Sequence, residues 1–168
     1  DLYLKEMLRM NPSGGICTGD INGDGLPDFY VTSPSGGGRL YRNRGGFQFT
    51  DATQEAGLGT DFWGTGASMV DLNNDGHLDL FVCCYRQPNR AYINDGTGRF
   101  SDRAAALHLG FSGGSMTMGW ADTDADGDLD GYLATTGTAP PHTPGSISVS
   151  TTPTGDHPCW ARCRANRC

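Results

Sequence analysis

The sequence lacks several features that define large classes of proteins. No apolar stretch approaches the roughly 18 residues that a membrane-spanning helix needs, so we expect no membrane span. Basic residues are scarce, since 12 Lys and Arg stand against 19 Asp and Glu and leave a net charge of −7. Because a phosphate backbone is bound by clustered cations, this balance argues against nucleic acid as a partner.

The usual signatures of enzymes are also missing. The sequence contains no Gly-x-Ser-x-Gly nucleophile elbow, no Walker loop, no dinucleotide-binding fingerprint and no Cys-x-x-Cys pair. We therefore expect a non-catalytic protein. The alternative is that the chain is part of the scaffold of a larger secreted hydrolase or lyase, with the catalytic residues outside these 168 residues.

What the sequence does contain is turn-forming residues and clustered acids. There are 26 Gly and 9 Pro, a content that fits many short strands joined by tight turns. More than half of the 19 acidic residues lie in three short windows, 20–28, 71–79 and 122–130. Carboxylates crowded in this way repel one another at neutral pH unless a positive charge lies among them.

The three acidic windows belong to an internal repeat. Asp20, Asp71 and Asp122 are spaced at intervals of 51 residues, and so are Asp28, Asp79 and Asp130. Because residues of very different chemistry share this spacing, we interpret it as a structural repeat. The other pairs related by the same offset are Tyr41 with Tyr92, Asn43 with Asn94, Phe49 with Phe100, and Asp51 with Asp102.

Each repeat unit predicts four short strands. An apolar or alternating run precedes the acidic window, a β-rich run follows it, and two further strands with a Gly-containing turn complete the unit. Four antiparallel strands per repeat are typical of a β-propeller blade, so we predict an all-β protein, a propeller fragment of about two and a half four-stranded blades. The predicted division is 1–13 lead-in, 14–64 first blade, 65–115 second blade, 116–138 partial third blade and 139–168 disordered low-complexity tail.

The acidic windows have the pattern of calcium loops. Oxygen-bearing side chains occupy positions 1, 3, 5 and 9 of each window, and Gly at position 6 permits a sharp turn. A donor set of oxygens alone favours Ca²⁺ over zinc or copper. We predict about three Ca²⁺ sites, in which Leu26, His77 and Asp128 contribute backbone carbonyls. The side-chain ligands are Asp20, Asn22, Asp24, Asp28, Asp71, Asn73, Asp75, Asp79, Asp122, Asp124, Asp126 and Asp130.

Two other interpretations of the windows explain less. An EF-hand loop requires Glu at position 12 between two helices, whereas Val31, Val82 and Leu133 stand there and the flanking segments are strand-like. Asp-Gly and Asn-Gly pairs also form ordinary turns, but a turn does not require acids and amides at the same offsets in three successive units.

At these residues the sequence resembles the FG-GAP or VCBS repeat family, and most closely its cartilage-acidic-protein and ASPIC/UnbV-type secreted members. The resemblance extends over about 14–136 and is carried by the acidic loops and by segments 39–43 and 47–51. It implies a seven- or eight-bladed propeller that holds calcium between the first two strands of a blade. The Phe-Gly-Gly-Ala-Pro signature of the family is absent, and only two and a half blades are present.

Several other residues have two interpretations. We expect one thiol of the Cys83-Cys84 pair to be buried and the other exposed, because side chains alternate along a strand. Trp63 and Trp120 are interpreted as blade-junction residues, and carbohydrate stacking is the alternative. Arg39, Arg42 and Arg44 are interpreted as a solvated strand, with an anionic glycan as the alternative ligand. The recurring aromatic residues predicted to form the blade core are Tyr41, Tyr92, Phe49 and Phe100.

The sequence-based hypothesis for function follows from these features. It describes a calcium-stabilised, secreted or cell-surface module that binds a protein or carbohydrate ligand, as in cell adhesion, with periplasm or outer surface as the location if the source is bacterial. Because each metal loop lies on a separate blade, the ions would be structural and would not share a substrate.

Overall fold

The computed structural model describes residues 14–135, which form an all-β fold without a helix in that range. The predicted lead-in, the last residues of the third unit and the tail predicted to be disordered lie outside the described residues. The strands are β1 (Ile16–Gly19), β2 (Asp28–Thr32), β3 (Gly38–Asn43), β4 (Phe49–Asp51), β5 (Gly64–Val70), β6 (Asp79–Pro88), β7 (Arg90–Asn94), β8 (Phe100–Asp102), β9 (Ser112–Ala121) and β10 (Asp130–Thr135).

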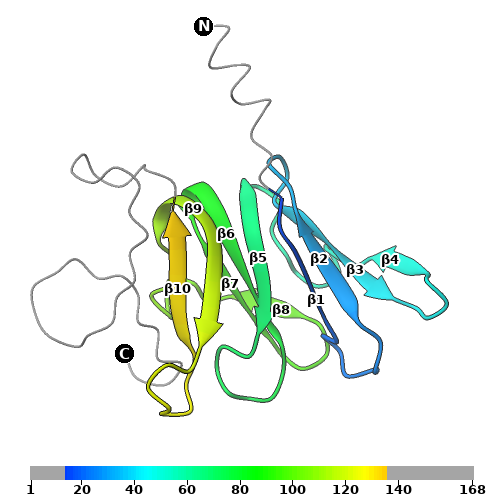
Figure 1. Ribbon diagram of the computed structural model, residues 1–168. Coiled ribbons are helices and arrows are strands. Elements are labelled where there is room, and N and C mark those ends of the chain that lie inside the picture. Colours follow the sequence, from blue (N-terminus) through cyan, green and yellow to red (C-terminus); the bar gives the residue numbers. More distant parts are fainter. Residues whose placement is uncertain (1–13, 136–168) are drawn as a thin grey trace, which may run out of the picture.

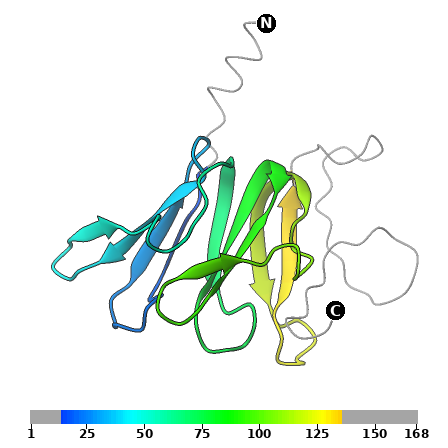
Figure 2. The ribbon, with the colours of Figure 1, turned by 180° about the vertical axis from the view of Figure 1, so that it is seen from behind.

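The strands form antiparallel blades that follow the repeat. In blade 1, β1 to β4 pair in sequence order, and in blade 2, β5 to β8 do the same. Blade 3 consists of β9 and β10 in the described part of the chain. Figures 1 and 2 show the blades fanned out, with β1 beside β5. The predicted fold class, a partial β-propeller of two and a half blades, is therefore confirmed.

Blades 2 and 3 are joined by an unexpected extension of β6. This strand continues to Pro88, and its second half pairs with the start of β9, so that a sheet of six strands runs across the two blades. The register shifts between Tyr85 and Gln87, where Arg86 adopts a φ of 56°. A β-bulge of this kind bends and twists a strand, which allows β6 to serve two blades.

Two apolar clusters fill the spaces between the blades. The first lies between blades 1 and 2 and includes Tyr30, Leu40 and Leu80, and the second lies between blades 2 and 3 and includes Phe81 and Leu109. Burial of these side chains is the main favourable contribution to the fold, at about 2 kcal/mol for each large residue. Each blade is thus stabilised by its neighbours.

The prediction that one of the two adjacent cysteines is exposed was wrong. Cys83 and Cys84 do point to opposite faces of β6, but the exposed fractions are only 1% and 0%. Cys84 belongs to the cluster against blade 1 and Cys83 to the cluster against blade 3. Because both faces of the central blade are covered, alternation does not expose either thiol.

The aromatic residues predicted to form the blade core differ between the blades. In blade 2 the prediction is confirmed, since Tyr92 is 3% and Phe100 8% exposed. In blade 1 it was wrong for Phe49, which is 38% exposed, while Tyr41 is half-buried. The reason is that blade 2 packs on blade 1, whereas nothing in the described residues covers the equivalent face of blade 1.

The predicted role of tryptophan at the blade junctions is confirmed for Trp120. Its indole Nε1 donates a hydrogen bond of 2.8 Å to Ser68 Oγ in blade 2, and its ring lies edge-on to Phe81. Trp63, which lies just before β5, contacts the ring of Tyr85.

Among residues 14–135, no helical segment of the length and hydropathy of a membrane span is found.

Candidate metal loops

The three acidic windows form loops at the same end of the fold. Each loop joins the first two strands of its blade, β1 to β2, β5 to β6 and β9 to β10. All three loops lie at the lower end of the sheets in Figure 1. The antiparallel pairing explains this arrangement, since the first strand of every blade runs in one direction and the second strand returns from the loop.

The carboxylate at the first position organises the backbone of each loop. Asp20 accepts hydrogen bonds from Gly23 N at 2.8 Å and from Gly25 N at 2.7 Å. Asp71 and Asp122 accept the equivalent bond from the Gly at position 6, at 2.8 and 3.0 Å. Desolvation raises the pKa of Asp20, but hydrogen bonds from backbone N–H groups, with that of Gly25 the largest, outweigh it and lower the pKa overall.

The Gly at position 6 has a positive φ in every loop, at 80°, 87° and 91° for Gly25, Gly76 and Gly127. A residue with a side chain is strained in this left-handed region, whereas glycine is not. The turn brings the N–H group at position 6 onto the first carboxylate, which explains why the sequence places glycine there.

Positions 3 and 5 bring further oxygens together. In the first loop Asn22 Nδ2 donates to Asp24 Oδ2 at 2.9 Å, and in the second Asn73 Nδ2 donates to Asp75 Oδ2 at 2.8 Å. The third loop has acids at both positions and at the first. One carboxylate oxygen from each of these three side chains lies within 4.8 Å of the others, in the cluster Asp122, Asp124 and Asp126.

The aspartate at position 9 is buried and tied to the backbone. Asp28 and Asp79 are both 0% exposed. Asp79 accepts hydrogen bonds of 2.8 Å from Leu72 N and from Asn94 N, so that it fastens the loop to β7. Asp28 makes the equivalent bonds to the N–H groups of the first loop and of β3. In the third loop, Asp130 accepts from Thr123 N and Thr123 Oγ1.

Burial raises the pKa of the position 9 carboxylates of the first two loops, Asp28 and Asp79. Desolvation raises the pKa of Asp79 to about 6, although its two backbone hydrogen bonds oppose the shift. Desolvation raises the pKa of Asp28 as well, and the charge of Asp24 adds to the effect. A buried carboxylate beside other carboxylates is costly when ionised, and a cation in the loop would offset that cost.

The residues at position 7 donate through their backbone to the acid at position 5. Leu26 N, His77 N and Asp128 N each contact that carboxylate, at 2.8, 2.9 and 3.1 Å. The His77 side chain is exposed. The expected contribution of these three residues, a backbone carbonyl directed at the metal, stays a prediction.

The oxygens of the loops fit a hard cation. Asn22 Oδ1 is buried and has no hydrogen-bond partner within residues 14–135. A buried acceptor without a partner costs about 1–3 kcal/mol, and a bound cation would remove that penalty. Together with the neighbouring carboxylates it offers the all-oxygen donor set that Ca²⁺ prefers. In the third loop the predicted ligands at positions 1, 3 and 5 lie together. The position 9 aspartates are held by backbone N–H groups, and their part in a metal site stays a prediction.

Sequence reasoning missed two contacts that link the loops to neighbouring blades. Asn94 in blade 2 donates from Nδ2 to Ile21 O of the first loop at 2.8 Å. Asn74 in the second loop donates to Asp128 Oδ1 of the third at 2.7 Å. The recurrence of Asn43 and Asn94 at the repeat offset was the available signal for the first contact.

The prediction of a solvated arginine strand was wrong for Arg42. Its side chain is 11% exposed and its Nη1 lies 3.5 Å from Glu55 Oε1. It is buried because the turn between β7 and β8, at Gly98, packs against it from blade 2. Arg39, in contrast, is exposed and lies 3.7 Å from Asp51 Oδ2.

The fold and the loops define a class, that of β-propeller repeat modules with an acidic loop in each blade. The FG-GAP-like repeat matches residues 20–82 and 71–133, and the chain therefore belongs to the FG-GAP-like repeat family. The two matched ranges begin at the first Asp of the first and second loops and extend through the loop of the following blade.

Individual proteins with the same repeats are also similar. Cartilage acidic protein 1 of Homo sapiens is 29% identical over 120 residues, covering 69% of this chain and 18% of that protein. Its counterpart in Mus musculus is 30% identical over 125 residues, covering 71% and 19%. The chain thus spans about a fifth of the length of these relatives.

Proposed function

We propose that this chain is a calcium-stabilised extracellular β-propeller module that binds a protein or carbohydrate partner and does not catalyse a reaction. The observation that carries the proposal is the cluster of three carboxylates in the third loop, Asp122, Asp124 and Asp126, in a loop whose backbone geometry the first two blades repeat. Calcium in this role is structural, since it neutralises the carboxylates and holds the first two strands of a blade together.

An extracellular location is supported by the character of the loops. Several of their acids, among them Asp24, Asp75 and Asp126, are exposed to solvent, and open loops of this kind bind Ca²⁺ weakly. Extracellular modules have dissociation constants of about 10⁻⁴ to 10⁻³ M, which calcium outside the cell can saturate. At a free concentration ten times the dissociation constant, each site would add roughly 1.4 kcal/mol to stability.

The test of the metal role uses conservative changes at position 5. Asp24→Asn, Asp75→Asn and Asp126→Asn keep the size and an oxygen acceptor but remove one charge from a single loop. We expect each to reduce the rise in Tm that millimolar Ca²⁺ produces, while Tm in chelator changes little. Equal Tm in Ca²⁺, in Mg²⁺ and in chelator for the unaltered chain would refute the metal role.

The binding role is tested separately. The full chain, labelled on its amino groups, is applied to a glycan array and to immobilised extracellular-matrix proteins in Ca²⁺ and in chelator. Saturable binding that is lost in chelator supports the proposal. If the folded, calcium-loaded chain binds neither type of surface, the partner assignment fails and the calcium assignment is unaffected.

A further inference from the structure

The first loop contains the only Asn-Gly pair in the sequence, Asn22-Gly23. In such a pair the backbone nitrogen of the glycine can attack the side-chain amide carbon of the asparagine, because the glycine has no side chain to hinder the approach. The second loop has Asn73-Asn74 at these positions and the third has Asp124-Ala125. Only the first loop therefore combines an amide at position 3 with a glycine at position 4.

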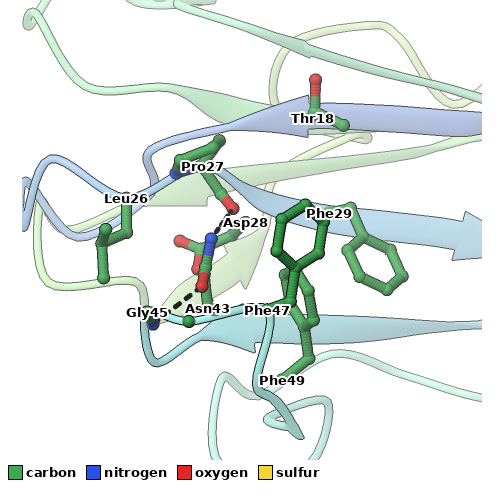
Figure 3. A pocket seen from close by; sticks show the side chains of 10 residues that line it. Thr18, Leu26, Pro27, Asp28, Phe29, Asn43, Gly45, Phe47 and Phe49 are labelled. Carbon is green, nitrogen blue, oxygen red and sulfur yellow. Dashed lines mark hydrogen bonds between the residues drawn. The ribbon is translucent and has the colours of Figure 1, made fainter.

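The loop around this pair is anchored at both of its ends. At the start, Ile21 is 2% exposed and its carbonyl accepts a hydrogen bond of 2.8 Å from Asn94 Nδ2 in blade 2. At the end, Asn43 Nδ2 donates to Pro27 O at 3.0 Å. Figure 3 shows this second bond, with Leu26 and Pro27 beside a pocket of blade 1. The reactive pair lies between the two anchors.

The segment between the anchors is open to solvent. Gly23, Asp24 and Gly25 are exposed. A Cβ on Gly23 would meet no heavy atom beyond the adjacent residues within 4 Å, and the same holds for Gly25. There is therefore space for the side chain of Asn22 to close onto the backbone, and water has access to the product.

Two carboxylates hold the two nitrogens that take part in the reaction. Asp20 Oδ1 accepts a hydrogen bond of 2.8 Å from Gly23 N, the attacking nitrogen, and is within reach to take its proton as a general base. Asp24 Oδ2 accepts a bond of 2.9 Å from Asn22 Nδ2, the nitrogen that leaves. Asn22 Oδ1 has no partner within residues 14–135, so the amide is held through its nitrogen alone.

We propose that Asn22 is a site of spontaneous deamidation in the folded protein, a self-modification that changes the charge of the first loop. Gly23 N forms a bond to Asn22 Cγ and gives its proton to Asp20. The proton passes through solvent to Nδ2, whose bond to Cγ breaks, and ammonia leaves. Water then opens the succinimide ring at either carbonyl, which gives aspartate or isoaspartate at position 22.

Each product changes the loop in a different way. Aspartate at position 22 adds one negative charge and gives the first loop acids at positions 1, 3 and 5, the arrangement that Asp122, Asp124 and Asp126 form in the third. Isoaspartate inserts an additional carbon into the backbone and disrupts the turn that Asp20 organises. The reaction itself does not depend on calcium, because every group in it belongs to the chain or to water.

The second loop provides a matched control within the same molecule. Asn73 Nδ2 donates to Asp75 Oδ2 at 2.8 Å, as Asn22 does at the equivalent position. The next residue is Asn74, whose side chain crowds its own backbone nitrogen and is tied to Asp128 Oδ1 at 2.7 Å. We therefore expect Asn73 to remain an asparagine under the same conditions.

The experiment follows the full chain during incubation at neutral pH and physiological temperature. Chelator is present throughout, so that the outcome is independent of the proposed calcium role. Peptide mass spectrometry measures the mass increase at each asparagine, and electron-transfer fragmentation distinguishes isoaspartate from aspartate. The same chain in urea is the unfolded reference, and far-UV circular dichroism checks the folding of every variant.

We expect Asn22 to deamidate at least about tenfold faster than Asn73, because glycine leaves the attack unhindered. Isoaspartate should be among the products. The rate in the folded chain should be no lower than in urea, since only the folded loop places Asp20 on the attacking nitrogen. Asp20→Asn, which keeps the size of the side chain, should slow the reaction in the folded chain and leave it unchanged in urea.

A gain of reaction in the second loop tests the proposal without any change to the first. Asn74→Gly suits the φ of 56° at that position and creates an Asn-Gly pair there. Asn73 should then deamidate faster than in the unaltered chain, while Asn22 reacts as before.

Two results would overturn the proposal. Asn22 that stays intact in the folded chain but deamidates in urea would show that the folded loop protects the pair. Equal rates at Asn22 and Asn73 in the folded chain would show that the glycine and the two carboxylates give the first loop no special reactivity.

Discussion

The Nδ2 atom of Asn94 lies 2.8 Å from Ile21 O and 2.9 Å from Leu78 O, so that one amide connects the acidic loops of two blades. Its Oδ1 accepts from Gly96 N and Gly98 N and completes the turn of its own hairpin. The side chain is 2% exposed. This residue therefore links the loop of one blade to the turn of the next.

Loss of this amide should destabilise the fold. We expect Asn94→Ala to lower the free energy of unfolding by about 2 kcal/mol, because buried carbonyls are left without donors. The matched control is Asn43→Ala at the equivalent position, whose side-chain hydrogen bonds within residues 14–135 stay in its own blade, with an expected loss below about 1 kcal/mol. Urea unfolding followed by far-UV circular dichroism measures both, and equal losses would show that the contact between blades contributes nothing.

A side chain at position 6 of each loop should destabilise the fold through backbone strain. Gly76→Ala places a Cβ at a φ of 87°, which costs about 1 kcal/mol through strain although the surrounding space is open. Gly119→Ala is the control, because Gly119 also has open space around it but no positive φ. Thermal unfolding should show a lower Tm for the first variant only, and a lower Tm for both would assign the effect to another cause.

The hydrogen bond between Trp120 and Ser68 should couple blades 2 and 3. We expect Trp120→Phe and Ser68→Ala each to lower the free energy of unfolding by about 1 kcal/mol, with the double variant losing little more than either single one. A double-mutant cycle from urea unfolding measures this coupling. Fully additive losses would mean that the two side chains act independently.

The cysteines of β6 should not react in the folded protein. Burial raises the pKa of Cys83 and of Cys84 to about 12, so both remain neutral thiols at pH 8. Peptide mapping after iodoacetamide treatment should show neither modified unless urea is added, and modification of either in native buffer would contradict the packing. Because the pKa of each thiol is higher in the folded than in the unfolded state, its contribution to the free energy of unfolding is fully present below the ordinary thiol pKa of 9.0. That contribution is lost as the pH rises toward 12.

The repeat made most of the fold predictable from the sequence. Because Asp20, Asp71 and Asp122 recur at one interval, the strands before and after each loop recur at the same interval, as the sequence predicts. The backbone geometry of the loops follows from the same spacing, since a glycine at position 6 turns the chain back onto its first carboxylate.

What the sequence could not provide is the environment that one blade creates for another. Tyr41 and Tyr92 are equivalent in sequence, yet only Tyr92 is covered, because burial depends on which neighbour is present. Cys84 is buried by blade 1 for the same reason. The extension of β6 to Pro88 depends on a bulge at Arg86, a residue that carries no local signal for one.

The most direct test of the account is calorimetric titration of the full chain with Ca²⁺, with Mg²⁺ as the control ion. We predict that about three equivalents of Ca²⁺ bind with dissociation constants near 10⁻⁴ to 10⁻³ M, as in extracellular modules, and that Mg²⁺ gives little heat. Binding of no Ca²⁺ by the folded chain, or equal binding of both ions, would contradict the assignment of the three loops as calcium sites.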